Sequence, residues 1–145
     1  MSEVADPLSA VLDTLIPPST DGRLPGAGEL GLAAALRERT AELGALIDQG
    51  LAAADAAAAE RGADRFAALP AEQRVSVLRE VESRQPAFLP SLLFELYAAY
   101  YRDPRVLTGL GLEARPPHPQ GYALEPGDLG ALERVRARGR LYREV

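Results

Sequence analysis

The chain has 145 residues, of which 47% are hydrophobic, a net charge of −5 and no cysteine. This length fits one domain with an ample core, and the acidic balance argues against binding nucleic acid or anionic membranes, which both require a basic surface. The lack of cysteine excludes disulfides, cysteine-ligated metals and thiol catalysis. No apolar run approaches the roughly 18 residues of a membrane span, so we expect no membrane insertion.

The N-terminal segment is acidic and lacks the basic-then-apolar order of a secretory or twin-arginine signal. We therefore expect the chain to stay in the cytoplasm. Asp6-Pro7 has the cap-then-proline form of a helix start. The short helix that it predicts ends at Pro17-Pro18 and has an apolar face of Leu8, Val11, Leu12 and Leu15. Residues 19–28 are rich in proline, glycine and aspartate and predict a loop.

An alanine-rich helical region is predicted for residues 29–61. Gly31, Gly44 and Gly50 each cost about 1 kcal/mol relative to alanine in a helix interior, so the region is either one kinked helix or two helices. Residues 52–59 have small side chains that let a neighbouring helix approach closely. An outer helix of a bundle is the plainer interpretation of this segment.

Gly62 suits the residue that follows a helix C-terminus, and residues 65–69 predict a connecting turn. Pro70 fits the first position of the next helix, whose expected buried face is Val75, Leu78 and Val81. That helix ends near residues 84–86, because the residue before Pro86 disfavours helical geometry.

Five of the eight aromatic residues lie between Phe88 and Tyr101. A helix that is apolar nearly all round is buried on most sides, so we expect a central aromatic helix over about residues 88–101. Its stripe consists of Leu89, Leu92, Leu93, Leu96, Tyr97 and Tyr100, widened by Phe94, Ala98 and Tyr101.

Asp103-Pro104 predicts a second short helix, to Leu110, that leaves at a sharp angle. Residues 115–122 hold three prolines and cannot form a regular helix or a central strand. A last short helix is predicted over residues 129–138, followed by the apolar pair Leu141-Tyr142. No segment predicts a strand. The expected fold is all-α, a single domain (residues 1–145) of five or six helices around the aromatic one, with residues 112–145 forming a partner-contacting arm and a short helix.

Catalytic residues are scarce. His118 is the only histidine, so paired-histidine metal sites are excluded; it is either a surface or packing residue or a lone acid, base or ligand. Glu95 lies in the aromatic helix and, if buried, needs a partner, which Arg102 or Arg105 could supply. A structural ion pair and a proton-transfer role both remain open. An enzyme centred on His118 and Glu95 lacks a second strong catalytic group, so we expect no catalytic, cofactor or metal site.

The residues that follow the aromatic helix suggest a recognition surface instead. Tyrosine and arginine are enriched at interface hot spots, and a proline-rich arm loses little entropy on docking. Tyrosine also occurs at the edge of cores with its hydroxyl in water, so interface use and core packing are both open. The candidate partner-binding residues are Tyr100, Tyr101, Arg102, Arg105, Pro116, Pro117, His118, Pro119 and Tyr122.

Three segments together resemble a known family. The first is Leu12-Asp-Thr-Leu-Ile-Pro17, followed after a short loop by Pro25-Gly26-Ala27. The second is Leu96-Tyr-Ala-Ala-Tyr-Tyr-Arg-Asp-Pro104, similar to a Tyr/Phe-x-Asp-Pro-Arg segment. The third is the arm from Pro116 to Tyr122, where family members carry a Gly-Tyr-Pro-Gly type of segment. In this order and spacing they resemble the gluconate 2-dehydrogenase subunit 3 family, from Leu12 to about Tyr122.

The resemblance implies an all-helical, non-catalytic subunit. Its usual partner is a large flavin-dependent dehydrogenase of the glucose-methanol-choline type that acts on sugars or sugar acids, so FAD is expected in the partner. Many members carry a twin-arginine signal and export the partner; this chain lacks the signal, and residues 124–145 carry no motif of the exported members. The leading hypothesis is an accessory subunit that binds, stabilises or helps mature the dehydrogenase. The alternative is a stand-alone helical interaction module, or a homodimer through the alanine-rich helix, without a flavoprotein partner.

Overall fold

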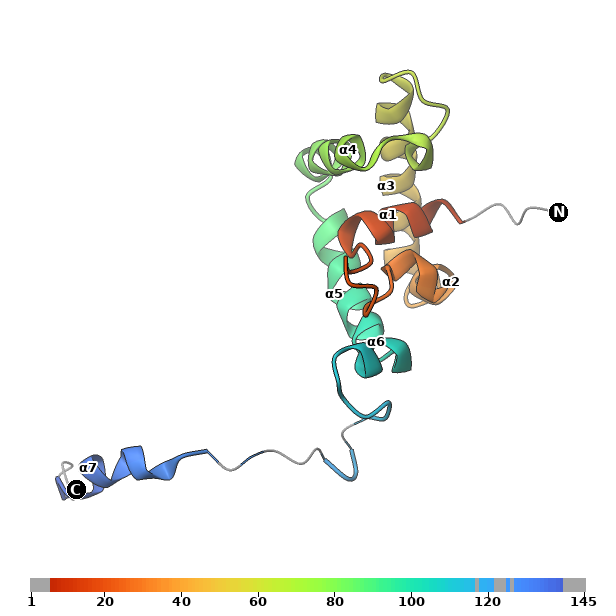
Figure 1. The fold of residues 1–145 in the computed structure, drawn as a ribbon. Helices are drawn as coiled ribbons and strands as arrows, with labels where there is room; N and C mark the ends of the chain where they lie inside the picture. Colours follow the sequence, from red (N-terminus) through yellow and green to blue (C-terminus); the bar gives the residue numbers. More distant parts are fainter. Residues whose placement is uncertain (1–5, 117, 122–124, 126, 140–145) are drawn as a thin grey trace. The chain divides into compact units, whose positions relative to one another are not determined.

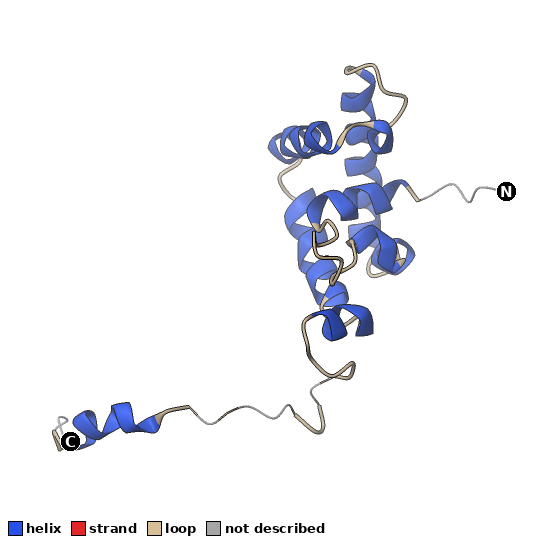
Figure 2. Ribbon diagram, in the orientation of Figure 1, coloured by secondary structure: helices blue, strands red, loops and turns tan. Residues whose placement is uncertain are grey.

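The structure is a computed structural model that describes residues 6–116, 118–121, 125 and 127–139. The chain divides into two compact units, Met1–Arg115 and Pro116–Val145, and the division falls close to residue 112, where we expected the arm to begin. No strand occurs among the described residues (Figure 2), which confirms the all-α fold. The expectation of a single domain stays a prediction.

The larger unit contains six α-helices and two 3-10 helices within its described residues (Figure 1). In chain order they are α1 (Pro7–Leu15), η1 (Ala27–Leu30), α2 (Ala33–Arg37), α3 (Ala41–Ala59), η2 (Phe66–Ala68), α4 (Ala71–Arg84), α5 (Phe88–Tyr100) and α6 (Pro104–Gly109). Both predicted cap-then-proline starts are confirmed. The Asp6 carboxylate accepts from the Leu8 N–H at 2.9 Å, and the Asp103 carboxylate accepts from the Arg105 N–H at 2.8 Å.

The alanine-rich region is divided between η1, α2 and α3. Gly31 has a φ of 70°, a left-handed conformation that ends η1 and that glycine adopts without steric cost. Thr40 starts α3, because its Oγ1 accepts a hydrogen bond from the Leu43 N–H at 3.1 Å. The helix then continues through Gly44 and Gly50 to Ala59, so neither of these glycines marks its break.

Helix α3 is the scaffold of the larger unit. It packs against α1, α2, α4, α5 and η2, whereas the main neighbours of α5 are α3 and α2. Gly50 allows the close approach of α5, since a Cβ atom there would lie 2.5 Å from Cε1 of the fully buried Phe88. The other large, fully buried side chains around this contact are Tyr100, Phe66, Leu8, Leu12, Ile47, Leu92, Leu96, Val11, Val77, Val81 and Val106.

The prediction that the aromatic helix is buried on most sides is wrong. Its face that contains Phe88, Leu92 and Leu96 is buried, but Phe94 is 74% exposed, Tyr97 47% and Tyr101, just after the helix, 52%. An α-helix turns by about 100° per residue, so positions 94, 97 and 101 lie on the side opposite the buried one. Neighbouring elements cover only one side of α5, and apolar residues on its other side therefore remain at the surface.

The predicted buried face of the fourth helix needs a smaller correction. Leu78 and Val81 are buried as expected, but Val75 is 40% exposed and Val77 takes its place in the core. Val75 lies three residues before Leu78 and Val77 four residues before Val81, so both fit a helical stripe. Which of them is covered depends on where α1 and α3 lie.

The smaller unit contains η3 (Leu129–Leu132) and α7 (Glu133–Arg136) among its described residues. Asp128 caps η3 by accepting from the Gly130 N–H at 2.9 Å. The last predicted helix is thus confirmed in part, with a 3-10 turn in its first half. Residues 116 and 118–121 form turns or irregular backbone, as the prolines predict. The predicted contacts of Pro117, Tyr122 and Leu141-Tyr142 lie outside the described residues.

Candidate partner-binding surface

Asp13, in the first sequence segment, holds the residue that follows the second part of that segment. Its Oδ1 accepts a hydrogen bond from the Gly28 N–H at 2.7 Å, and a Cβ atom on Gly28 would lie 2.5 Å from Oδ2 of the same carboxylate. Glycine is therefore required for this close approach. The carboxylate holds η1 against the end of α1, which is a structural role.

Tyr100 ties the second segment to the first. The side chain is only 2% exposed, and its hydroxyl donates a hydrogen bond to the carbonyl oxygen of Pro25 at 2.9 Å. Burial raises the pKa of the Tyr100 phenol, and the nearby Tyr101 and Asp103 side chains add to the rise, so the hydroxyl stays protonated as a donor. Of the two interpretations left open for Tyr100, core packing is the one that its burial supports. Tyr100 does not lie on an exposed surface, so its prediction as a partner-binding residue is corrected.

Arg105 also has an intramolecular role. Its guanidinium contacts the Asp103 carboxylate at 3.1 Å and donates to the carbonyl of Leu30 at 3.4 Å. The hydrogen bond from Arg105 is the main reason why the pKa of Asp103 lies below its ordinary value. This arginine therefore stabilises the turn into α6 and links it to η1, although its side chain is more than half exposed.

Tyr101 and Arg102 are exposed predicted site residues of this region. The Tyr101 ring lies edge-on to Tyr100, with centroids 5.2 Å apart, and tilted against Tyr97 at 6.2 Å. Arg102 forms no ion pair with another residue in the described part of the chain. These two residues remain candidates for a partner contact.

The exposed side of α5 continues from Tyr101 back to the start of the helix. Pro90, Phe94, Tyr97 and Tyr101 are all exposed, and they follow one another at i, i+4, i+7 and i+11, the spacing of a single helix face. We call these four residues the α5 outer stripe. Sequence reasoning missed it because it merged two apolar registers, one from Leu89 and one from Pro90, into one broad stripe.

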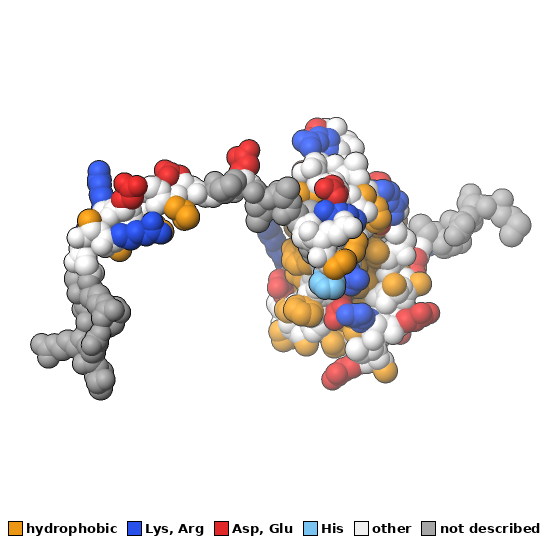
Figure 3. Space-filling view, turned by 90° about the horizontal axis from the view of Figure 1, so that it is seen from below, with side chains coloured by type: hydrophobic (Ala, Val, Ile, Leu, Met, Phe, Trp, Pro, Cys, Tyr) orange, Lys and Arg blue, Asp and Glu red, His pale blue; other side chains and the backbone are white. Residues whose placement is uncertain are grey.

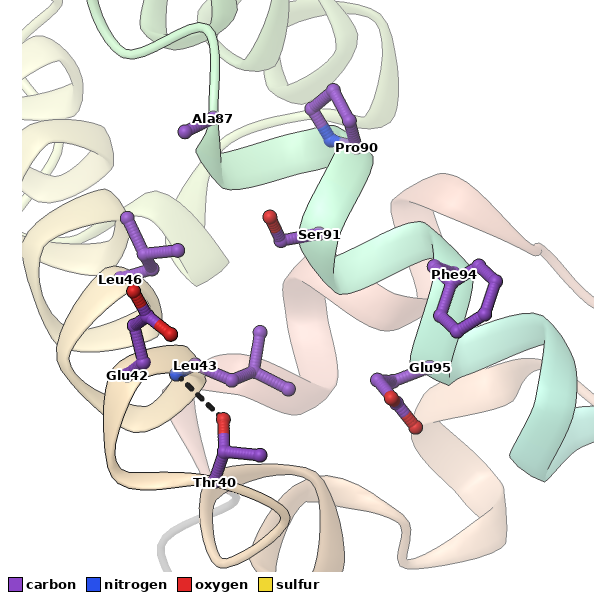
Figure 4. Close-up of a pocket in the computed structure, with 9 residues that line it drawn as sticks. All are labelled: Thr40, Glu42, Leu43, Leu46, Ala87, Pro90, Ser91, Phe94 and Glu95. Carbon is purple, nitrogen blue, oxygen red and sulfur yellow. Dashed lines mark hydrogen bonds between the residues drawn. The ribbon is translucent and has the colours of Figure 1, made fainter.

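An open groove lies between the start of α3 and α5, next to this stripe (Figure 4). Its volume is about 610 Å³. Phe94 and Pro90 project from α5 on one side, and Leu43 and Leu46 come from α3 on the other. The full lining is Thr40, Glu42, Leu43, Leu46, Ala87, Pro90, Ser91, Phe94 and Glu95. We call this the α3–α5 groove.

Glu95 pairs with Arg39, not with Arg102 or Arg105 as predicted. The Nε of Arg39 lies 2.8 Å from Oε2 of Glu95. Arg39 follows α2, which packs against α5. Arg102 comes seven residues after Glu95, which places it roughly 10 Å from Glu95 along the helix axis. The Arg39 side chain is 59% exposed and that of Glu95 22%, as in a surface ion pair. The structural interpretation of Glu95 is the one that this contact supports.

The predicted arm residues belong to the smaller unit. Pro116, His118 and Pro119 are exposed there, whereas Pro117 and Tyr122 lie outside the described residues. Their proposed part in binding stays a prediction.

The described residues are more informative about the protein surface than about reactive groups. Among them no group of three or more histidine, aspartate and glutamate side chains is placed to hold a metal ion, and no described helix is long and apolar enough to cross a membrane. On the face seen in Figure 3, acidic and basic side chains are interspersed and hydrophobic side chains gather between them.

The larger unit is thus an all-helical domain with an exposed aromatic helix face. Residues 3–115 match the family model of gluconate 2-dehydrogenase subunit 3, and the chain belongs to this family. The family is that of an accessory subunit in a dehydrogenase complex, which implies association with a catalytic subunit. The match ends where the larger unit ends, at Arg115, so the third segment of the resemblance lies beyond it. No curated protein and no solved structure matches the chain.

Proposed function

We propose that this chain is a non-catalytic subunit of a flavin-dependent dehydrogenase of the glucose-methanol-choline type that acts on sugars or sugar acids. It binds the catalytic subunit, which carries FAD, and stabilises it or helps it mature, in the cytoplasm. The observation that carries this proposal is the family match over residues 3–115, which includes every described helix of the larger unit.

The contacts of the two candidate chemical groups support a binding role. Glu95 is engaged by Arg39, and His118 is exposed in the smaller unit. Stabilisation of the partner then follows from mass action, because a subunit that binds the folded form alone adds RT ln(1 + [L]/Kd), about 2.7 kcal/mol at a hundredfold excess over Kd. No catalytic group of this chain is needed for that effect.

The test is co-expression of the full chain, tagged, with a flavoprotein dehydrogenase of the glucose-methanol-choline type from the same genome. We expect the flavoprotein to co-purify, to hold more flavin and to unfold at a higher temperature than when it is produced alone. Absorbance of bound flavin, calorimetry and turnover with sugar substrates measure these effects. No co-purification and unchanged flavin content would refute the proposal.

Sedimentation of the isolated chain tests the alternative of a homodimer. Helix α3 presents exposed alanines at positions 52, 56 and 59, and close helix contact through them would give a stable dimer. A monomer in isolation that binds the dehydrogenase favours the accessory subunit, whereas a tight dimer without affinity for the flavoprotein favours the stand-alone module.

A further inference from the structure

Helix α5 has two apolar faces, and the described helices of the larger unit cover only one of them. The buried face contains Phe88, Leu92 and Leu96. The α5 outer stripe runs along the opposite side from Pro90 to Tyr101, roughly 16 Å at the rise of an α-helix. Single exposed apolar residues are common, but contiguous exposed apolar surface marks an interaction site.

Phe94 links the stripe to the α3–α5 groove. It is the most exposed large apolar side chain among the described residues, at 74%, and it also lines the groove, whose α3 side is formed by Leu43 and Leu46. The stripe and the groove therefore meet at Phe94, which forms a ridge with a hollow beside it. The hollow has a mixed lining, in which Thr40, Glu42, Ser91 and Glu95 lie next to the apolar residues. A helix that presents its own apolar ridge fits such a hollow between two helices.

The charged side chains at the two ends of this surface have opposite signs. Glu42 lines the groove beside the first turns of α5, and Arg102 follows the last turn. Between them Glu95 is neutralised by Arg39 at 2.8 Å. In the part of the chain that the structure describes, neither Glu42 nor Arg102 forms an ion pair. The edge is thus acidic at one end and basic at the other.

We propose that the α5 outer stripe and the α3–α5 groove dock an amphipathic helix of the dehydrogenase catalytic subunit. The helix places apolar side chains in the groove beside Phe94 and along the stripe at Tyr97. It carries a basic residue that faces Glu42 and an acidic residue that faces Arg102, which sets its direction along α5. The identity of this occupant rests on the proposed function; the aromatic surface, the groove and the charge order come from the structure.

Binding affinity of full-length variants tests the surface. The probe is the flavoprotein dehydrogenase retained by the wild-type chain, with Kd measured by surface plasmon resonance. Phe94→Ala is expected to weaken binding by about 30-fold or more, as for an aromatic hot spot, and Tyr97→Ala to weaken it as well. Val75→Ala is the matched control, because Val75 is an exposed apolar residue on α4; its Kd is expected to stay at the wild-type value.

Arg102→Ala tests the proposed orientation of the docked helix, which depends on the opposite charges at the two ends of the surface. Charges at the edge of an interface act mainly on the association rate and on its salt dependence. This variant is therefore expected to associate several-fold more slowly and with a weaker salt dependence than wild type. An unchanged rate and salt dependence would remove Arg102 from the interface and overturn the proposed orientation.

Photo-crosslinking identifies the occupant. A benzoylphenylalanine in place of Pro90, Tyr97 or Tyr101 is expected to capture one segment of the catalytic subunit, at positions that advance by three or four residues from one variant to the next, as a helix requires. Crosslinks to residues 129–138 of the same chain, or to a second copy, would show another occupant and overturn the proposal.

The outcomes separate this inference from the proposed function. If wild type binds the dehydrogenase and Phe94→Ala binds it equally well, the surface is wrong and the accessory role stands. If wild type binds no flavoprotein, both are wrong. Circular dichroism of Phe94→Ala is expected to match wild type, because the exposed side chain contributes little to the core.

Discussion

The Tyr100 hydroxyl donates a hydrogen bond to the carbonyl oxygen of Pro25, 75 positions earlier in the chain, at 2.9 Å. Beside this contact, Asp13 accepts from the Gly28 N–H, and Arg105 donates to the Leu30 carbonyl. The two segments that resembled the family motifs in this region therefore meet around η1. Their shared role is to hold α1, η1 and the end of α5 together.

Tyr100→Phe is expected to lower the free energy of unfolding by about 1 kcal/mol, the net contribution of one hydrogen bond. The ring stays in the core, so the far-ultraviolet circular dichroism is expected to stay the same. Urea unfolding at pH 7 measures the difference. A loss below about 0.3 kcal/mol would contradict a stabilising bond to Pro25, given the usual range for such bonds.

The pH dependence of this variant follows from the direction of the pKa shift. Burial raises the pKa of Tyr100 above 10.0 in the folded state, so the folded state retains the phenolic proton where the unfolded chain loses it. The contribution is fully present below pH 10 and is lost as the pH rises through the raised value. The stability of wild type is expected to fall more steeply above pH 10 than that of Tyr100→Phe.

Phe88 and Phe94 lie on opposite sides of α5. Their substitutions by alanine are therefore expected to have very different effects on the free energy of unfolding. Phe88→Ala removes a fully buried ring and is expected to cost about 3–5 kcal/mol. Phe94→Ala is expected to change stability by less than about 0.5 kcal/mol, as for a surface substitution. Thermal and urea unfolding of the two variants measures this difference. Equal losses would show that the outer side of α5 is covered in the isolated protein.

Gly50→Ala is expected to destabilise the protein, although alanine is the better helix former. Helix propensity alone favours the substitution by about 1 kcal/mol, but the new Cβ atom would lie 2.5 Å from the Phe88 ring. Overpacking of this kind typically costs about 1–3 kcal/mol. Ala52→Gly, at an exposed position of the same helix, is the control and is expected to lose about 1 kcal/mol. A gain in stability on Gly50→Ala would show that α3 and α5 lie further apart.

Acid destabilisation is expected to depend on Glu80. A hydrogen bond from Arg61 at 2.9 Å lowers the pKa of Glu80 below 4.5, against the opposing effect of burial, and Arg84 adds to the decrease. The unfolded chain therefore takes up the proton first, so this contribution is present above pH 4.5 and is lost as the pH falls through the lowered folded value. Arg61→Gln is expected to flatten the decline of stability below pH 4.5. An identical pH profile would show that the pair contributes nothing.

Local signals in the sequence predicted the helix starts well. Asp6 and Asp103 each cap a helix through a backbone N–H two residues away, and such bonds form without help from the rest of the chain. The break before α3 follows from the same chemistry at Thr40, and of the three glycines that predicted a break, Gly31 marks the end of η1 whereas Gly44 and Gly50 lie inside α3. The all-α fold and the family assignment also followed from the sequence.

Contacts between residues that are far apart in the sequence were not predicted. Glu95 had candidate arginines nearby in sequence, but Arg39, 56 positions away, is its partner. Tyr100 and Tyr101 are neighbours of the same type, yet the first is buried and the second half exposed. Periodicity shows which residues share a helix face, but it cannot show whether another element covers that face.

The sequence by itself thus determined the helical elements and the family, because propensity, capping and motif spacing are properties of the local chain. Only the tertiary structure decided which apolar side of α5 enters the core. Gly50 lets Phe88 pack against α3, so the side that contains Phe88, Leu92 and Leu96 is desolvated. The other apolar side, around Phe94, remains in water, because its burial requires a surface that the described helices do not provide.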